Sequence, residues 1–300
     1  MRINIDGVLR TVVYGRPCSI YGDPIEKKPL FHFLPGTEIL SIATVGCNLH
    51  CRNCQNWEIS QANPEESVAY PLEPTSLVKA AIEQKYPSIA YTYTDPVIFY
   101  EYTYDSAKLA KNSGIRNVLV TAGYINQKPW KELLPFIDAA NIDLKGINND
   151  FYVNVCSGTL KPVQDAMVTA KAMGVMVEVT NLIIPTLNDS DNDIQKLCKW
   201  VAENLGTETP MHFSRFFPRY KMRNLPPTPS STLDRARQIA MAEGLHYVYI
   251  GNIRSMEGQN TYCPKCHRLL IRRSGYTILE NNLKEGQCPE CGHNIYGVWK

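Results

Sequence analysis

Alternating strand and helix patterns constrain this chain most, because they run almost without a break from residue 39 to residue 250. Short apolar runs of the kind that form buried strands are each followed by a segment with helical periodicity. The expected strands are 39–43, 88–93, 117–121, 141–144, 175–184, 211–216 and 247–250. The expected helices are 76–85, 100–113, 129–134, 162–173, 191–204 and 233–243. This alternation predicts an α/β fold with a parallel sheet.

Polar residues recur where the expected strands end. They are Thr94 and Asp95, Thr121, Asp143 and Lys145, and Thr180 and Asn181. In closed barrels and in open parallel sheets alike, this edge carries the chemistry. No GxGxxG motif follows the first strand, which disfavours a dinucleotide-binding fold.

Length and charge set further bounds. The chain has 300 residues and a net charge of +2, which suits one large domain with a small appendage and gives no reason to expect nucleic-acid binding. No apolar run reaches the roughly 18 residues of a membrane helix. The first 13 residues alternate like a strand pair and lack the apolar core of a signal peptide. We therefore expect a cytoplasmic protein without a membrane partner.

Three segments follow from these patterns. Residues 1–35 are expected to hold a β-hairpin that turns at Asp6 and Gly7, followed by a proline-rich connector. Residues 36–255 carry the alternating α/β pattern. Residues 256–300 are expected to form a small separate module rich in turns and cysteine.

Seven of the ten cysteines fall into two groups. One is the loop Cys47-x3-Cys51-x2-Cys54, directly after the first expected strand of the sheet. The other consists of two Cys-Pro-x-Cys turns with the residues Cys263, Cys266, Cys288 and Cys291. In a chain without a secretion signal, close pairs of this kind indicate metal ligands rather than disulfides.

The three-cysteine loop predicts an iron–sulfur cluster. Its spacing lets one loop wrap a [4Fe-4S] cube, which normally takes four thiolates. With three thiolates in the loop, one iron stays open to a ligand such as the amino and carboxylate groups of S-adenosylmethionine (SAM). The alternatives are a zinc loop or three buried cysteines, but zinc prefers four closed ligands.

Longer motifs strengthen this interpretation. The segments VYGRPCSI, DPIEKKPLFHFLPG, CQNWEISQA, DPVIFYEY, IDLKG and HFSRF resemble the AmmeMemoRadiSam radical SAM proteins, which are relatives of the pyruvate formate-lyase activating enzymes. The resemblance implies a partial (β/α)6 barrel and reductive cleavage of SAM to a 5′-deoxyadenosyl radical. It also implies an electron donor such as ferredoxin or flavodoxin, and Memo-like and AMMECR-like protein partners.

The chain departs from the pattern of these relatives at several positions near SAM. Asn53 stands where an aromatic residue usually precedes the third cluster cysteine. Asp95 replaces a usual glutamate, Ala122 a usual asparagine, and Phe217 aligns with a histidine that approaches SAM in the activating enzymes. The resemblance therefore carries over all three cluster cysteines, whereas these positions around SAM depart from its pattern.

Five residues are expected to bind SAM. Asp143 and Lys145 fall on one face of a strand, and a charged pair inside a barrel needs a partner or a ligand. In the activating enzymes the matching pair lies beside SAM; a plain internal salt bridge is the alternative. Asp95 resembles the residue that receives the SAM ammonium, although it could also cap the helix at 100–113. Thr121 and Asn181 complete the set. Glu178 and Thr180 are expected to line the barrel near the substrate; for His212 that position is the alternative to a satisfied core residue, which is the commoner role of a lone histidine in a strand.

The C-terminal cysteines predict a structural zinc ribbon. Four thiolates close the coordination shell, which leaves no open position for chemistry. Rubredoxin-like iron is the alternative, since thiolates accept both metals. Arg268, Arg272 and Arg273 form a local basic spot, which is expected to be a solvated face rather than a nucleic-acid site.

These patterns predict a radical SAM enzyme that modifies a protein or a small molecule. A glycyl-radical activase is one alternative. A catalytically inactive protein that binds metal through the loop and the ribbon is an alternative of another class.

Overall fold

Seven parallel strands in sequential order form the central sheet of the computed structural model, which describes residues 1–253 and 257–300. The strands are β4 (Glu38–Ala43), β5 (Ser88–Tyr91), β6 (Arg116–Thr121), β7 (Ala139–Asp143), β8 (Met176–Ile183), β9 (Met211–Arg215) and β10 (Val248–Gly251). An antiparallel strand, β3 (Ser19–Pro24), extends the edge beside β4. The expected parallel α/β sheet is confirmed.

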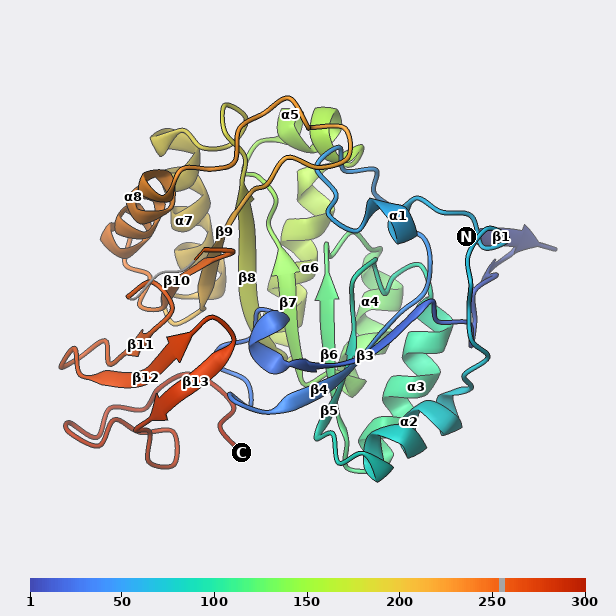
Figure 1. The fold of residues 1–300 in the computed structure, drawn as a ribbon, viewed down its shortest axis with the longest axis horizontal. Helices are drawn as coiled ribbons and strands as arrows, with labels where there is room; N and C mark the ends of the chain where they lie inside the picture. Colours follow the sequence, from blue (N-terminus) through green and yellow to red (C-terminus); the bar gives the residue numbers. More distant parts are fainter. Residues whose placement is uncertain (254–256) are drawn as a thin grey trace.

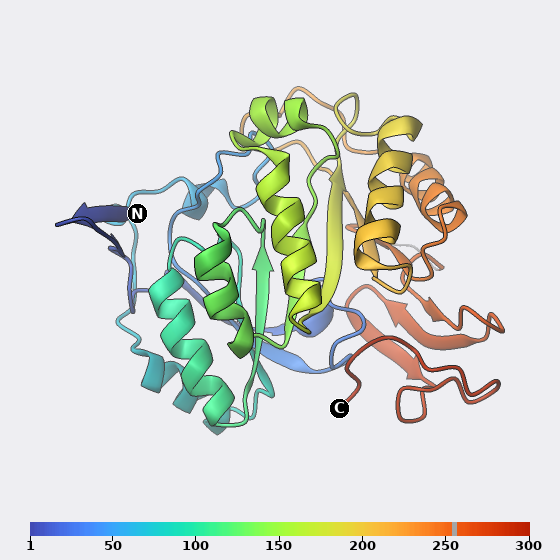
Figure 2. The same ribbon diagram turned by 180° about the vertical axis from the view of Figure 1, so that it is seen from behind.

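Six helices connect these strands and lie on one face of the sheet (Figure 2). They are α2 (Pro74–Glu83), α3 (Tyr100–Asn112), α4 (Gln127–Leu133), α6 (Leu160–Ala172), α7 (Asp191–Leu205) and α8 (Ser230–Ala242). The shorter helical pieces are α1 (Trp57–Ser60), α5 (Asn149–Phe151), η1 (Ile25–Lys27), η2 (Leu134–Phe136) and the π-helical turn η3 (Tyr152–Cys156). In the described part of the chain no helix is long and apolar enough to cross a membrane.

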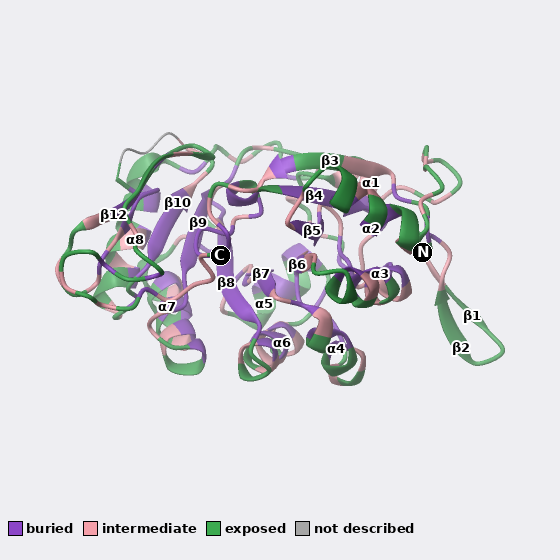
Figure 3. Cartoon of the chain, turned by 90° about the horizontal axis from the view of Figure 1, so that it is seen from below, coloured by how far each residue is buried: buried purple, intermediate pink, exposed green. Residues whose placement is uncertain are grey.

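The sheet curves without closing. Its strand order runs from β10 at one edge to β3 at the other, and the two edges do not pair with each other among the described residues. Figure 3 shows the strands as a curved wall with the helices outside it. Six strand–helix units followed by a seventh strand thus make the expected partial (β/α)6 barrel.

Strand alternation separates two apolar layers. Ile42, Leu119 and Val179 belong to the layer that packs against the helices. On the opposite face, Val118 and Met176 pack with connector residues, among them Phe33. Because successive strand residues point to opposite faces, the same alternation decides which polar residues enter the barrel.

The N-terminal hairpin consists of β1 (Arg2–Ile5) and β2 (Val8–Thr11) and projects from the body of the molecule (Figure 1). Asp6 and Gly7 have φ values of 51° and 81°, as a two-residue turn of the expected kind requires. Arg2 anchors the hairpin through ion-paired hydrogen bonds to Glu101 of α3.

The C-terminal segment forms β11 (Thr261–Tyr262), β12 (Leu269–Ser274) and β13 (Thr277–Asn281). The predicted boundary at residues 255 and 256 lies outside the described residues. The segment shares an apolar cluster with the connector and with β10, in which Phe31, Tyr249 and Leu270 are buried together. The ribbon thus packs directly against the connector and the β10 edge of the sheet.

Candidate functional site

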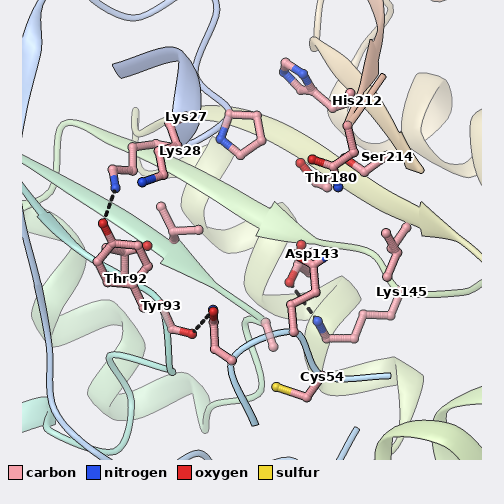
Figure 4. A pocket seen from close by; sticks show the side chains of 18 of the residues that line it. Lys27, Lys28, Cys54, Thr92, Tyr93, Asp143, Lys145, Thr180, His212 and Ser214 are labelled. Carbon is pink, nitrogen blue, oxygen red and sulfur yellow. Dashed lines mark hydrogen bonds and ion pairs between the residues drawn. The ribbon is translucent and has the colours of Figure 1, made fainter. Parts of the chain in front are cut away.

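A cavity of about 590 Å³ opens at the carboxyl ends of the parallel strands. It is lined from three directions: by the loop after β4, by residues at the ends of β5 to β10, and by the connector and the ribbon. Figure 4 shows Cys54, Asp143 and Lys145 on one side of it, with His212, Ser214 and Thr180 across from them.

The three-cysteine loop lies between β4 and α1, and other segments brace its backbone. His50 N donates to Cys156 O at 3.0 Å, and Arg52 N donates to Val155 O at 2.9 Å. The π-helical turn η3 therefore holds the middle of the loop. Asn56 fixes its far end by donating to Tyr93 O at 2.7 Å. Such fixation lets a loop present several ligands in a set geometry.

The thiols of Cys47, Cys51 and Cys54 all line this cavity. Four thiolates around one zinc ion lie about 3.8 Å apart, given a Zn–S bond of about 2.3 Å. The three loop thiols do not come together within 4.8 Å, as such a site would require. Three spaced thiols beside an open cavity fit a polynuclear cluster, whose irons each take one thiolate.

Asp143 is the last residue of β7 and Lys145 follows it; both point into the cavity, as strand alternation predicts (Figure 4). Lys145 Nζ lies 2.7 Å from Asp143 Oδ2. Burial opposes the charge on Lys145, but the Asp143 carboxylate, together with the thiols of Cys51 and Cys156, more than offsets it, so the pKa of Lys145 lies well above its usual value. A cation beside the cluster loop is thus available to an anionic group in the cavity.

Asp95 and Thr121 both line the cavity but are already bonded within the protein. Asp95 Oδ1 accepts from Thr121 Oγ1 at 2.9 Å and from Val97 N at 3.1 Å, and Oδ2 accepts from Ala122 N at 2.9 Å. Burial raises the pKa of this carboxyl. With three of about four acceptor positions used, Asp95 joins the ends of β5 and β6 and keeps little capacity for a ligand.

Asn181 is not brought to the cavity. Its Nδ2 donates to Leu144 O at 2.7 Å on the other face of the sheet. Thr180 and Leu182 line the cavity on either side of it. Of the two residues predicted at this strand end, Thr180 lines the cavity, whereas Asn181, which was expected to bind SAM, does not. The period of two starting from Glu178 selects Thr180.

Two cavity residues that the sequence prediction missed are Lys28 and Tyr93. Lys28 Nζ lies 2.6 Å from Asp23 Oδ2, and its charge lies 4.5 Å from the centre of the Tyr93 ring. Burial lowers the pKa of Lys28 to about 8. Tyr93 has a φ of 65°, which is uncommon for a residue with a side chain and is often found at functional sites. The alternating pattern gave no signal that the connector reaches this cavity.

The C-terminal cysteines form a different kind of site. The sulfurs of Cys263, Cys266, Cys288 and Cys291 all lie within 4.8 Å of one another. The pairs Cys263–Cys291 and Cys266–Cys288 are each separated by 3.6 Å. These spacings fit one tetrahedral metal ion. The group could therefore bind a metal, and it lies outside the cavity.

Comparison with known proteins agrees with this geometry. The model of the radical SAM superfamily matches residues 41–201. An uncharacterised protein of Methanocaldococcus jannaschii is 49% identical over 296 residues, which cover 98% of this chain and 88% of that protein. The pyruvate formate-lyase-activating enzyme of Clostridium pasteurianum is 28% identical over 154 residues, covering 51% of this chain and 64% of the enzyme.

Solved structures share the fold. SuiB of Streptococcus suis bound to its precursor peptide SuiA superposes with a TM-score of 0.56 at 12% identity, over 77% of this chain and 51% of that chain. TYW1 with a lysine-pyruvate adduct bound superposes with a TM-score of 0.52 at 13% identity, over 75% of this chain and 80% of that chain. The family match spans the cluster loop and most of the cavity-lining strands. The chain therefore belongs to the radical SAM superfamily and is an enzyme of that superfamily.

Proposed function

We propose that this enzyme cleaves SAM reductively at a [4Fe-4S] cluster held by Cys47, Cys51 and Cys54. When bound, the cluster supplies the electron that breaks the S–C5′ bond of SAM and yields a 5′-deoxyadenosyl radical. One observation carries the proposal: three thiols that lie too far apart for a single ion share one cavity with Lys145.

The residues of the chain have distinct tasks in this proposal. Lys145 binds the carboxylate of SAM, and Asp143 holds the Lys145 side chain in place through the 2.7 Å contact. Asp95 and Thr121 fix the strand ends that border the cofactor. The connector and ribbon close the far side of the cavity and so exclude water from the reaction.

The substrate is a protein or a small molecule, and we propose Memo-like and AMMECR-like proteins as partners and a ferredoxin or flavodoxin as electron donor. The similarity to two activating enzymes, those of pyruvate formate-lyase and of 4-hydroxyphenylacetate decarboxylase, favours a glycyl-radical activase as the second candidate. We further propose zinc as the metal of the four-cysteine site, in a structural role.

The test is anaerobic reconstitution followed by reduction with dithionite in the presence of SAM. The proposal predicts 5′-deoxyadenosine and methionine in equal amounts. Incubation with candidate partner proteins, followed by mass spectrometry, separates the two candidates. An activase leaves a radical on a partner glycine, whereas a modifying enzyme changes the mass of its substrate. A reconstituted protein that forms no 5′-deoxyadenosine would contradict the proposal.

A further inference from the structure

His212 lies on β9 across the cavity from Cys54 (Figure 4), although the sequence favoured a core position over one that lines the barrel. Its ring is held from two sides. Nε2 lies 2.6 Å from Glu178 Oε2, and the ring packs edge-on against Phe31 at 4.9 Å. Glu178 is fully buried, so this contact also supplies one of the donors that a buried carboxylate needs.

Glu178 decides which nitrogen of His212 carries a proton. The carboxylate also accepts from Phe31 N at 2.9 Å and from His32 N at 2.8 Å. Burial opposes its charge, but the bonds from His212 and His32 keep the pKa of Glu178 below its usual value. An ionised carboxylate only accepts hydrogen bonds. Nε2 of His212 must therefore carry a proton, whether the ring is neutral or charged.

Nδ1 is the remaining nitrogen of the ring. Nδ1 makes no hydrogen bond to any described residue. It is also absent from the fully buried atoms that lack a partner, so it is not fully buried. It therefore reaches the cavity that His212 lines. The hydroxyl of Ser214, two residues along the same face of β9, likewise has no hydrogen-bond partner among the described residues and borders the same space.

We propose that His212 binds a hydroxyl group of the substrate through Nδ1, on the wall of the cavity that faces the cluster. A hydroxyl matches this position because it both donates and accepts, and so pairs with Nδ1 in either charge state of the ring. Glu178 is a positioning residue that fixes the ring through Nε2. The inference rests on the proposed function and extends it by assigning a substrate class, a hydroxyl-bearing molecule or side chain.

The arrangement resembles the histidine–carboxylate pairs in which a carboxylate orients the ring for a substrate on the other side. Its setting supports this role. Arg273 of the ribbon donates to Phe31 O at 2.7 Å and lies over the Phe31 ring at 4.4 Å. The ribbon thus holds the aromatic side chain against which the His212 ring rests, and in this way it acts on the substrate side of the cavity.

The test compares two substitutions that each imitate one half of the imidazole. His212→Gln keeps a donor for Glu178 but lacks the acceptor at Nδ1. His212→Asn places an amide near Nδ1 but loses the contact with Glu178. His246→Gln is the matched control, because His246 forms a similar pair with Glu208, 2.5 Å apart on the surface and outside the cavity.

The probe is glycerol with deuterium on its carbon atoms, added below saturation to the reconstituted holoenzyme with SAM and dithionite. Mass spectrometry measures both the amount of 5′-deoxyadenosine and its deuterium content. In the wild-type protein and in His246→Gln, deuterium should enter 5′-deoxyadenosine. In His212→Gln the deuterium content should fall about tenfold, as expected of one lost hydrogen bond. His212→Asn should keep more deuterium transfer than His212→Gln.

A second readout needs no catalysis. Nitrogen-15 NMR of histidine-labelled protein, assigned with His212→Gln, should show a proton on Nε2 of His212 and a response of Nδ1 to glycerol. Unlabelled 5′-deoxyadenosine from the wild type, or equal deuterium transfer in His212→Gln, would overturn the inference. So would a loss of SAM binding in His212→Gln, which would place the residue in the SAM site. If the wild type forms no 5′-deoxyadenosine at all, the proposed function fails instead.

Discussion

The two cysteine groups of this protein differ in the spacing of their sulfurs, in the openness of their surroundings and in how their positions are fixed. The loop of Cys47, Cys51 and Cys54 spreads three thiols along the edge of a cavity, whereas the ribbon gathers four within 4.8 Å. An open edge leaves room for a ligand, while a filled tetrahedron leaves none. The spacing of the sulfurs therefore suits the loop to an open cluster and the ribbon to a single closed metal ion.

The two groups also depend on different neighbours. The loop is braced by backbone contacts from η3 and lies at the carboxyl ends of the strands. The ribbon is embedded through side chains: Arg273 is 2% exposed and reaches Phe31 of the connector. Damage to the loop should therefore remove chemistry and spare the fold, whereas damage to the ribbon should weaken the fold first.

The largest effect is expected from Cys47→Ala, Cys51→Ala or Cys54→Ala. Each removes one of the three thiolates that the loop offers to the cluster, so cluster iron and 5′-deoxyadenosine formation should both fall to background. Iron analysis and chromatography of the products measure this. Cys18→Ser is the control, because Cys18 lies outside the cavity and should retain both. A loop variant with full activity would contradict the assignment of the open centre.

A large loss of stability is expected from Cys288→Ser in the ribbon. Three remaining thiolates hold a metal far less well, and metal binding contributes directly to folding. We expect the ribbon metal to be lost and Tm to fall by about 10 °C or more, while reconstituted cluster iron persists at low temperature. Loss of the cluster in this variant without any change in Tm would erase the distinction between the two groups.

Acid should destabilise the folded protein by protonating His32, which lies in the connector beside the ribbon. Burial lowers the pKa of His32 from 6.5 to about 4 in the folded protein. The unfolded chain therefore binds more protons between these values, and stability falls as the pH drops from 6.5 towards 4. The free energy of unfolding should fall by about 3 kcal/mol over this range. Urea unfolding at about pH 7 and about pH 4.5 measures it.

The control for this effect is His32→Gln, which should be less stable near neutral pH but should show a weaker dependence on pH. The ring bonds Tyr296 O through Nδ1 and Tyr249 OH through Nε2, each at 2.5 Å. A carbonyl only accepts, so Nδ1 carries the proton and Nε2 accepts from the tyrosine. An equal pH dependence in both proteins would show that other groups cause the acid effect.

Lys145→Ala should weaken SAM binding about 10- to 100-fold, as loss of one charge-assisted hydrogen bond implies, with the cluster intact. Titration of SAM into the reduced protein, followed by EPR, measures this. Lys79→Ala, which removes an exposed lysine on α2, is the matched control. Unchanged affinity together with a clear loss of thermal stability would make Asp143 and Lys145 an internal salt bridge only.

Sequence patterns predicted the sheet, the helices and both cysteine groups because these depend on local periodicity and short spacings. The alternation at β7 also placed Asp143 and Lys145 in the cavity. The same alternation, not applied at β8, would have chosen Thr180 over Asn181. Strand alternation, helical periodicity and cysteine spacing depend only on nearby residues, so they can be predicted from a single sequence.

The features that the sequence did not predict depend on contacts between distant parts of the chain. Glu178 bonds Phe31 across 147 residues, and Arg273 bonds Phe31 across 242. The local sequence patterns of the connector, the ribbon and β9 do not predict that these segments meet inside the barrel. Arg273 was expected in a solvated basic spot, and the structure buries it instead. The contacts of Lys28 with Tyr93 and of His212 with Glu178 likewise join segments that are far apart in the sequence.

The most direct test of the central claim is an EPR titration of the anaerobically reconstituted, reduced protein with SAM. The account predicts four irons per chain beyond the ribbon metal, and a cluster signal that changes shape as SAM binds the open iron. A protein that holds no iron at Cys47, Cys51 and Cys54, or a cluster signal that stays the same at saturating SAM, would contradict it.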